Sequence, residues 1–269
     1  MNNNNGSLSA LRQGLQETED LVLARKFAPV LRLDRSEPWR PTAIGYTVSD
    51  RVSKSASSKF EITPRVGRVI EYAIFWDYDI QHLYDLEHVW VHLDMQDQVV
   101  AVEASQHGKR IEMLVNGDLP LENGRVTLWA EPGKHAHFAS RDAMKEREAH
   151  TRYECSLGAG LYGVHMGNPF SHEFGEITPY EHRLARLQAQ RLSLEPSFGE
   201  TIRWDCAEGD LASWPTVQTW IPQRVKYLIA DLRVNLPHLK AIFLDCGDTL
   251  IDEGTEIKKE GSDVAHGAE

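Results

Sequence analysis

Apolar and polar residues alternate along the centre of the chain with the two-residue period that is typical of β-strands. In one such stretch Val89, Val91 and Leu93 point to one face, and the residues between them point to the other. The pattern predicts strands at residues 69–79, 87–94, 99–105 and 125–130. Because these strands follow one another without intervening helices, we predict a mainly β (α+β) fold, an antiparallel β-sandwich with a few flanking helices.

Helical periodicity is confined to the flanks of this strand-rich centre. Helices are predicted at residues 10–27, 139–153, 178–195 and 215–232. The third has the clearest start, because Thr178 is a good N-cap and Pro179 suits the first helical position. Residues 156–175 are rich in glycine and predict a long shaped loop.

Composition divides the chain into three parts. Residues 1–9 are polar and of low complexity, which predicts a disordered tail. Residues 10–237 carry the strands and helices and form the predicted β domain. Residues 238–269 begin with a short strand pattern and end in a charged stretch, so we predict a separate segment there.

The charge balance narrows the class of partner. A formal net charge of −11 repels phosphate backbones, so nucleic-acid binding is disfavoured. The sequence contains no run of about 18 apolar residues, so we expect no membrane span. The N-terminus lacks the pattern of a signal peptide. The three widely spaced cysteines, Cys155, Cys206 and Cys246, favour free thiols, so we expect a soluble cytoplasmic protein.

An acidic run joins the first two central strands. Asp77, Asp79, His82, Asp85 and Glu87 lie within eleven residues, in the sequence DYDIQHLYDLE. The linker 80–84 is short enough for a hairpin loop, which would carry His82 and bring the carboxylates to one end of the sheet.

Carboxylates held this close repel one another, so either some bind protons or a cation neutralises them. A divalent metal answers the repulsion best: oxygen ligands suit Mg²⁺, Ca²⁺ or Mn²⁺, and an added imidazole favours Mn²⁺, Fe²⁺ or Zn²⁺. The alternative is an acidic turn exposed to solvent and without a metal.

Two histidine-containing segments follow later strands and are candidates for the same cleft. One is the sequence SQHG at residues 105–108, and the other is EPGKHAH at residues 131–137. Polar residues at the ends of rigid strands commonly bind ligands. Each histidine taken alone could equally be a structural hydrogen-bonding residue.

These elements carry a family resemblance. The pattern His-x-x-Asp-x-Glu at residues 82–87, the Ser-x-His-Gly element at 105–108 and the Gly-x-His-Ala element at 133–136 resemble the necrosis-inducing, NPP1-like superfamily and the related Vps62-like domains. The opening sequence APVL at 28–31, followed by Glu37-Pro38, also resembles a Vps62-like domain. The resemblance covers about residues 24–140. It implies a β-sandwich with an acidic, cation-filled cavity at one end, which in the necrosis-inducing branch engages sphingolipid sugar head groups.

The resemblance also implies roles for single residues. His82 and Asp85 would be metal ligands, with Asp77 or Asp79 as the earlier ligand. Glu87 would be the adjacent catalytic carboxylate, joined by His107 and His135, the histidines of the two later elements. The contiguous His-Asp-Trp-Glu core of the necrosis-inducing branch is replaced here by the spaced run that ends in Glu87.

A second resemblance lies near the C-terminus. The sequence KAIFLDCGDTL at residues 240–250 is similar to the first motif of haloacid-dehalogenase-like hydrolases, in which Asp245 would be the nucleophile. Only 21 residues follow Asp248, which leaves no room for the later motifs of a working hydrolase. We therefore expect a vestige, a fragment or the truncated start of a fused hydrolase; a final strand capped by a turn fits the sequence as well.

Three functions remain open from the sequence. The first is a metal-dependent, hydrolase-like enzyme that acts on an unknown small, glycan-like or lipid-like substrate, with Glu87 or a nearby histidine as general base. The second is a non-catalytic, metal-dependent module that binds a glycan or lipid head group, using Trp76, Trp90 and Trp129 as exposed stacking platforms. The third is a structural β domain without metal. The oligomeric state cannot be derived from these patterns.

Overall fold

We describe the protein from a computed structural model, in which Leu8, residues 17–167 and residues 170–236 are placed well enough to describe. The chain divides into two compact units, residues 1–234 and residues 235–269. The fold and the site below belong to the first unit. The haloacid-dehalogenase-like sequence at 240–250 lies outside the described residues, and the prediction of a separate segment from residue 238 stays a prediction.

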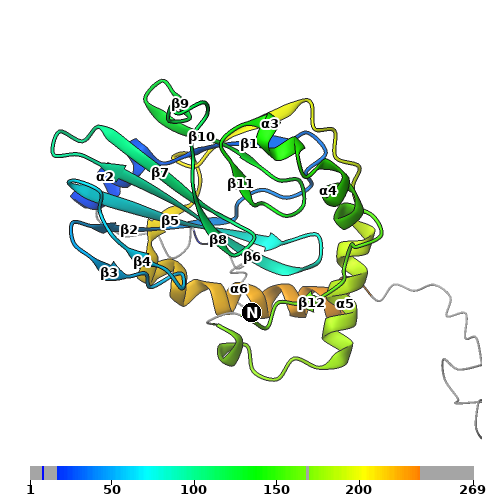
Figure 1. Cartoon of the computed structure of the whole chain (residues 1–269). Coiled ribbons are helices and arrows are strands. Elements are labelled where there is room, and N and C mark those ends of the chain that lie inside the picture. The colour runs from blue at the N-terminus through cyan, green and yellow to red at the C-terminus, as the bar shows by residue number, and fades with distance from the viewer. Residues whose placement is uncertain (1–7, 9–16, 168–169, 237–269) are drawn as a thin grey trace, which may run out of the picture. The chain divides into compact units, whose positions relative to one another are not determined.

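A seven-stranded sheet forms one layer of the fold (Figure 1). Its strands run in the order β14-β2-β5-β6-β7-β8, with β12 paired to β6. Their bounds are β2 Ala43–Ser49, β5 Arg68–Tyr78, β6 His82–Leu93, β7 Val99–Gln106, β8 Lys109–Glu112, β12 Gly163–Val164 and β14 Leu211–Ser213. Neighbours from β2 to β8 pair antiparallel, whereas β14 and β12 join in parallel.

A five-stranded sheet forms the second layer, in the order β11-β10-β1-β13 with β9 paired to β10. Its bounds are β1 Val30–Asp34, β9 Leu121–Glu122, β10 Arg125–Ala130, β11 His137–Phe138 and β13 Thr201–Asp205. The strands β3 Ser53–Lys54 and β4 Glu61–Ile62 form a separate pair. The predicted β-sandwich with a few flanking helices is confirmed, although β1 and β10 pair in parallel.

Helices cover the faces and ends of these layers. They are α2 Glu19–Phe27, α3 Arg141–Lys145, α4 Glu148–Cys155, α5 Pro179–Arg191, α6 Trp214–Asn235 and the 3-10 turn η1 Ser171–Glu173. As the sequence predicted, Thr178 caps α5, and it does so in a reciprocal capping box with Glu181. Figure 1 shows α6 against the seven-stranded sheet, where Trp220 packs edge-on against Phe75.

The central hairpin β5–β6 is buried on both faces, which explains its unbroken apolar sequence. One face of the seven-stranded sheet packs on α6 and the other lies inside the sandwich, so Tyr72, Ile74 and Phe75 are all inaccessible to solvent. The predicted strand 69–79 therefore matches β5 closely, and the predicted strand 125–130 matches β10.

The turn between β5 and β6 is tighter than the sequence predicted. Asp79 and His82 exchange backbone hydrogen bonds of 2.9 and 3.2 Å, so only Ile80 and Gln81 form the loop. The predicted loop 80–84 and a strand start at residue 87 are therefore wrong. His82 is the first residue of β6, and Asp85 and Glu87 lie within that strand.

Candidate functional site

Three turns that are distant in sequence meet at one end of the sandwich. The β5–β6 turn forms backbone hydrogen bonds with the other two turns. Ile80 N donates to Gly133 O at 2.7 Å, and Gly160 N donates to Ile80 O at 2.8 Å. In addition, Tyr162 N donates to Gln81 O at 2.9 Å. The acidic run, the turn 131–136 and the glycine-rich loop 156–175 are thus joined through their backbones.

Glycine is required where the turn 131–136 touches its neighbours. Gly133 has a φ of +69°, and a Cβ there would lie 3.0 Å from both Cys155 Sγ and Ile80 Cβ. Its N–H donates to Glu37 Oε2 at 2.6 Å, so the segment that follows β1 holds this turn as well. The turn is therefore fixed, and the two residues after Gly133 are aimed at the acidic run.

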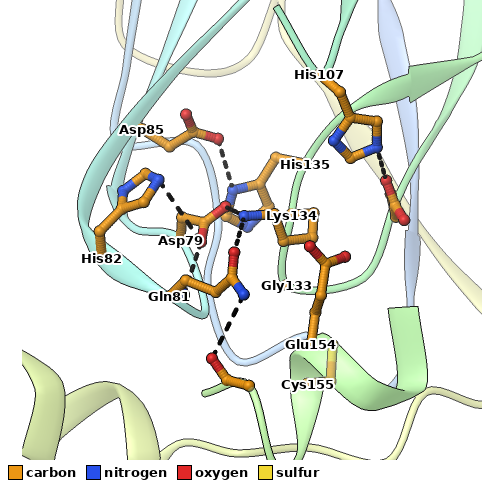
Figure 2. Close-up of polar contacts among 12 residues, drawn as sticks. Asp79, Gln81, His82, Asp85, His107, Gly133, Lys134, His135, Glu154 and Cys155 are labelled. Atoms are coloured by element: carbon orange, nitrogen blue, oxygen red, sulfur yellow. Dashed lines mark hydrogen bonds and ion pairs between the residues drawn. The ribbon is translucent and has the colours of Figure 1, made fainter. Parts of the chain in front are cut away.

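The first of these two residues, Lys134, pairs with Asp79. Lys134 Nζ lies 2.7 Å from Asp79 Oδ2 and donates to Gln81 Oε1 at 3.0 Å, as Figure 2 shows. The other oxygen of Asp79 accepts from Gln81 N at 2.6 Å. Burial works to lower the pKa of Lys134, but the charge of Asp79, the hydrogen bond to it and the charges of Asp85 and Glu154 together raise this pKa, so the side chain stays an ammonium ion.

The second residue, His135, pairs with Asp85. His135 Nδ1 donates to Asp85 Oδ2 at 3.4 Å, and Nε2 lies 3.7 Å from Glu37 Oε1. Its ring stacks on Trp76 with centroids 3.8 Å apart. Burial opposes a charge on either partner, but the hydrogen bond and the charges hold the pKa of Asp85 well below its usual range and raise that of His135. The two form a buried ion pair.

Glu87 shares a face of β6 with Asp85 but has the opposite character. Burial, followed by the negative charge of Asp85, raises the pKa of Glu87 well above its usual range, so it is protonated near neutral pH. The Ser105 hydroxyl, at the end of β7, is its hydrogen-bonding partner. Two carboxyl groups two residues apart are thus held in different protonation states. We call the set of charged and acidic side chains at this end of the sandwich the end cluster: Glu37, Asp79, Asp85, Glu87, Lys134 and His135.

Two cavities open beside the end cluster. The larger, about 430 Å³, is lined by His82, Tyr162, Val164, His165, Met166, Gly167 and His182. The smaller, about 150 Å³, is lined by Ser57, Tyr84, Asp85, Leu86, His88, His165, Gly167 and Phe170. His82 connects the larger cavity to the cluster, because its Nε2 lies 3.8 Å from Asp79 Oδ1 and its ring meets that of His165 with centroids 4.7 Å apart.

The structure separates the other two predicted site residues from the end cluster. Asp77 forms a two-point ion pair with Arg224 of α6, with distances of 2.9 and 2.6 Å. His107 lies at the β7–β8 turn, and its Nε2 is 2.6 Å from Glu131 Oε2. Figure 2 shows His107 directed away from Asp79 and Asp85. The structure thus brings together Asp79, His82, Asp85, Glu87 and His135.

The backbone is unusual at Tyr84 and His135, beside the acidic run, and at His107, away from the end cluster. Tyr84, His107 and His135 have φ values of 54°, 50° and 58°, a left-handed conformation that is uncommon for residues other than glycine. Such conformations concentrate at functional sites, where the surrounding structure holds them in place. At His135 this conformation accompanies the turn of the ring towards Asp85 and Trp76.

Sequence reasoning missed several members of the site and misassigned its aromatics. Lys134, Gln81 and Glu37 received no role, although a lysine beside a histidine in the turn 131–137 was a visible signal for a counter-charge. The prediction that Trp76 and Trp90 are exposed platforms for sugars is wrong, because both side chains are fully buried. Tyr162 is the aromatic residue that faces solvent at the larger cavity, with 57% of its surface exposed.

The expected divalent metal can be compared with the donors that are present. Both oxygens of Asp79 are engaged, by Lys134 and by the Gln81 backbone. Asp85 accepts from Leu86 N at 2.9 Å and from His135. Within Leu8, residues 17–167 and residues 170–236, no group of three or more His, Cys, Asp or Glu side chains is arranged to hold a metal ion. The donor set therefore does not fit a divalent ion as it stands, and metal binding stays a prediction.

Comparisons with known proteins give limited information. No family model and no curated protein matches the chain, and nothing supports the haloacid-dehalogenase-like fragment. Among solved structures, NLPPya in complex with glucosamine aligns with 18% identity over 48% of this chain and 80% of that chain, with a TM-score of 0.31. A toxin fold for microbial attack and plant defense aligns with 18% identity over 48% of this chain and 81% of that chain, with a TM-score of 0.31. Necrosis and Ethylene inducing Protein 2, from the causal agent of cocoa's Witches Broom disease, aligns with 17% identity over 52% of this chain and 80% of that chain, with a TM-score of 0.28.

These neighbours are necrosis-inducing toxin folds, the class that the sequence motifs resemble, and the likeness is partial. TM-scores of this size do not carry a functional assignment, so we derive the function from the geometry of the site. A separate finding concerns membranes: none of the helices in the described residues combines the length and apolar character that crossing a bilayer requires.

Proposed function

We propose that this protein binds a hydroxyl-rich, sugar-like small molecule in the larger cavity, which His82 connects to the end cluster. The observation that carries the proposal is the lining of that cavity. Its volume of about 430 Å³ falls within the range of about 300–1,000 Å³ that is typical of small-molecule sites. Its polar groups are the imidazoles of His82, His165 and His182, which can donate to or accept from hydroxyl groups.

Tyr162 gives the cavity an aromatic edge. Its ring lies 6.5 Å from that of His82, between centroids, and is tilted by 41°. An exposed tyrosine combines an apolar face, which packs on the C–H face of a sugar ring, with a hydroxyl group that forms hydrogen bonds. An aromatic platform beside a few convergent polar groups is a common arrangement for the recognition of small polar ligands.

The charge of the end cluster sets a preference among sugars. The carboxylates of Glu37, Asp79 and Asp85 face two cations, Lys134 and His135, so an acidic excess lies next to His82. Opposite charges attract across a poorly solvated site, so a sugar with a protonated amine is favoured over a neutral one, and an anionic sugar is disfavoured. Glucosamine, the ligand of one structural neighbour, is a suitable probe.

Titration calorimetry with glucosamine, glucose and glucuronate tests the proposal. Glucosamine is expected to bind best and glucuronate least well. Tyr162→Ala is expected to weaken the binding of glucosamine by about threefold to tenfold, the effect of losing one aromatic contact. Tyr153→Ala is the matched control, because Tyr153 is 54% exposed and lines neither cavity. Equal affinity of the two variants, or no binding of any of the three sugars, would reject the proposal.

A second candidate function is metal-independent acid–base hydrolysis by the same site. It rests on the placement of Asp85 and Glu87 on one face of β6, where paired carboxyl groups can act as base and acid on a bound ester or glycoside. His135 holds Asp85 in its orientation. A screen of nitrophenyl esters and glycosides, followed by Glu87→Gln, tests it: turnover should fall by roughly 100-fold or more. Turnover that survives this substitution would remove Glu87 from the chemistry.

A further inference from the structure

We propose that the Lys134 ammonium group is the resident cation of the end cluster and occupies the place that a divalent metal would otherwise take. The acidic run requires a positive charge, because carboxylates at this density repel one another. The structure supplies that charge from the chain itself. This inference concerns the counter-charge and does not depend on sugar binding.

The contacts of Lys134 are those expected of a bound cation. Its Nζ has two oxygen neighbours, Asp79 Oδ2 at 2.7 Å and Gln81 Oε1 at 3.0 Å, and its side chain is only 11% exposed. An ammonium group is a compact charge with three donors, so it can satisfy several oxygens at once. A metal ion that approached Asp79 through Oδ2 would have to displace this group.

Lys134 is held in place by the turn that carries it. Glu131 N donates to Ala136 O at 2.8 Å and closes the turn, and Ile80 N donates to Gly133 O at 2.7 Å and docks the turn on the β5–β6 hairpin. The left-handed conformations of Gly133 and His135 bracket the lysine on both sides. The position of the ammonium group therefore follows from the fold of two turns and is built into the site.

The remaining oxygen and nitrogen donors are also engaged within the protein. Asp85 is bound by the Leu86 backbone and by His135, as described above, and His82 Nδ1 donates to Tyr84 O at 2.9 Å. Removal of the lysine charge would free the Oδ2 edge of Asp79, about which His82 and Asp85 could gather. A variant without Lys134 is therefore expected to gain the divalent-cation site that the wild-type protein does not need.

The experiment compares the full-length wild-type protein with Lys134→Met, which removes the charge and keeps most of the volume. Thermal unfolding is measured in EDTA and in millimolar MnCl₂, and bound Mn²⁺ is measured by electron paramagnetic resonance. The wild-type protein is expected to unfold at the same temperature in both solutions. The variant is expected to unfold at a lower temperature in EDTA and to regain roughly 5 °C in MnCl₂.

Lys226→Met is the matched control, because Lys226 is an exposed lysine on α6 that lines neither cavity. It should behave like the wild-type protein. Stoichiometric divalent metal in purified wild-type protein, or a lower unfolding temperature of that protein in EDTA, would overturn the proposal. A folded Lys134→Met variant that binds no Mn²⁺ would also overturn it. If that variant does not fold, Lys134→Gln replaces it, and elemental analysis of the wild-type protein remains decisive by itself.

Discussion

Two groups of charged side chains, one mostly buried and one partly buried, differ in how their charges are balanced. In the end cluster, the carboxylates of Glu37, Asp79 and Asp85 and the protonated Glu87 lie beside two cations, Lys134 and His135. In the second group, on β6, β7 and β8, the carboxylate of Glu103 accepts from His92 Nε2 at 2.8 Å and is paired with Arg110. Arg65 lies 3.8 Å from Glu103 and 3.3 Å from Glu112. We call this second group the Glu103 cluster.

The difference lies in which charge is in excess and in what lies beside it. The carboxylate of Glu103 has two close donors of its own, His92 and Arg110, and the members of its cluster line neither cavity. The end cluster has too few cations, and Asp85 and His82 face the cavities. A saturated ion pair stabilises the fold, whereas an under-compensated one next to a cavity can still attract a ligand. This contrast, more than the number of acidic residues, is why we propose the end cluster as the functional site.

The largest loss of unfolding free energy is expected from Asp85→Ala. The substitution leaves the buried imidazolium of His135 without its main partner, and breaking such a pair costs about 3–5 kcal/mol of unfolding free energy. Urea unfolding measures the loss. Asp85→Asn, which keeps the size and a neutral acceptor, should lose less. If the unfolding free energy of Asp85→Ala stayed within about 1 kcal/mol of the wild type, Asp85 and His135 would not form a buried ion pair.

Glu103→Gln should have a smaller effect with a definite pH dependence. Burial works to raise the pKa of Glu103, but the hydrogen bonds of His92 and Arg110 lower it to about 2. The stabilisation is therefore complete above the ordinary glutamate pKa of about 4.3 and is lost as the pH falls towards 2. At pH 7 we expect a cost of roughly 1.5–3 kcal/mol. Urea unfolding at several pH values checks this, and a difference that persists unchanged at pH 2 would contradict it.

The effect of Glu87→Gln on stability should depend on pH in the opposite sense to that of Glu103→Gln. The folded protein keeps Glu87 protonated at pH values where the unfolded chain has released that proton, so the stability of the wild type falls as the pH rises above about 4.3. Glutamine cannot ionise, so the variant should gain stability relative to the wild type by at most about 1.4 kcal/mol per pH unit. The same unfolding series measures it. A relative stability independent of pH would mean that Glu87 is ionised like an exposed glutamate.

The smallest effect is expected outside both clusters. Arg35 and Glu200 form an ion pair at the surface, with side chains 70% and 73% exposed. Water and salt screen such pairs, so Arg35→Ala should change the unfolding free energy by less than about 0.5 kcal/mol. Urea unfolding of Arg35→Ala measures this change and serves as the baseline for the other variants. A loss as large as that of Glu103→Gln would show that exposure does not separate functional from structural charges here.

The sequence by itself determined the main elements and the chemical character of the site. The apolar density of residues 69–79 and the alternation of residues 87–94 predicted two central strands, since side-chain burial follows backbone periodicity. The spacing of Asp77, Asp79, His82, Asp85 and Glu87 predicted that they would gather at one sheet end, and in the structure all but Asp77, which binds Arg224, do so. Such signals are local, so they can be read without coordinates.

The tertiary structure decided which partner each charged residue takes. Asp77 and Asp79 are two residues apart, yet one binds Arg224 of α6 and the other binds Lys134 of the turn 131–136. His107 and His135 occupy similar motifs, but one pairs with Glu131 and the other with Asp85. These pairings join segments about 20 to 150 residues apart, and they depend on how turns dock on one another. Local periodicity carries no information about that docking, so the resident lysine and the buried tryptophans could be found only in three dimensions.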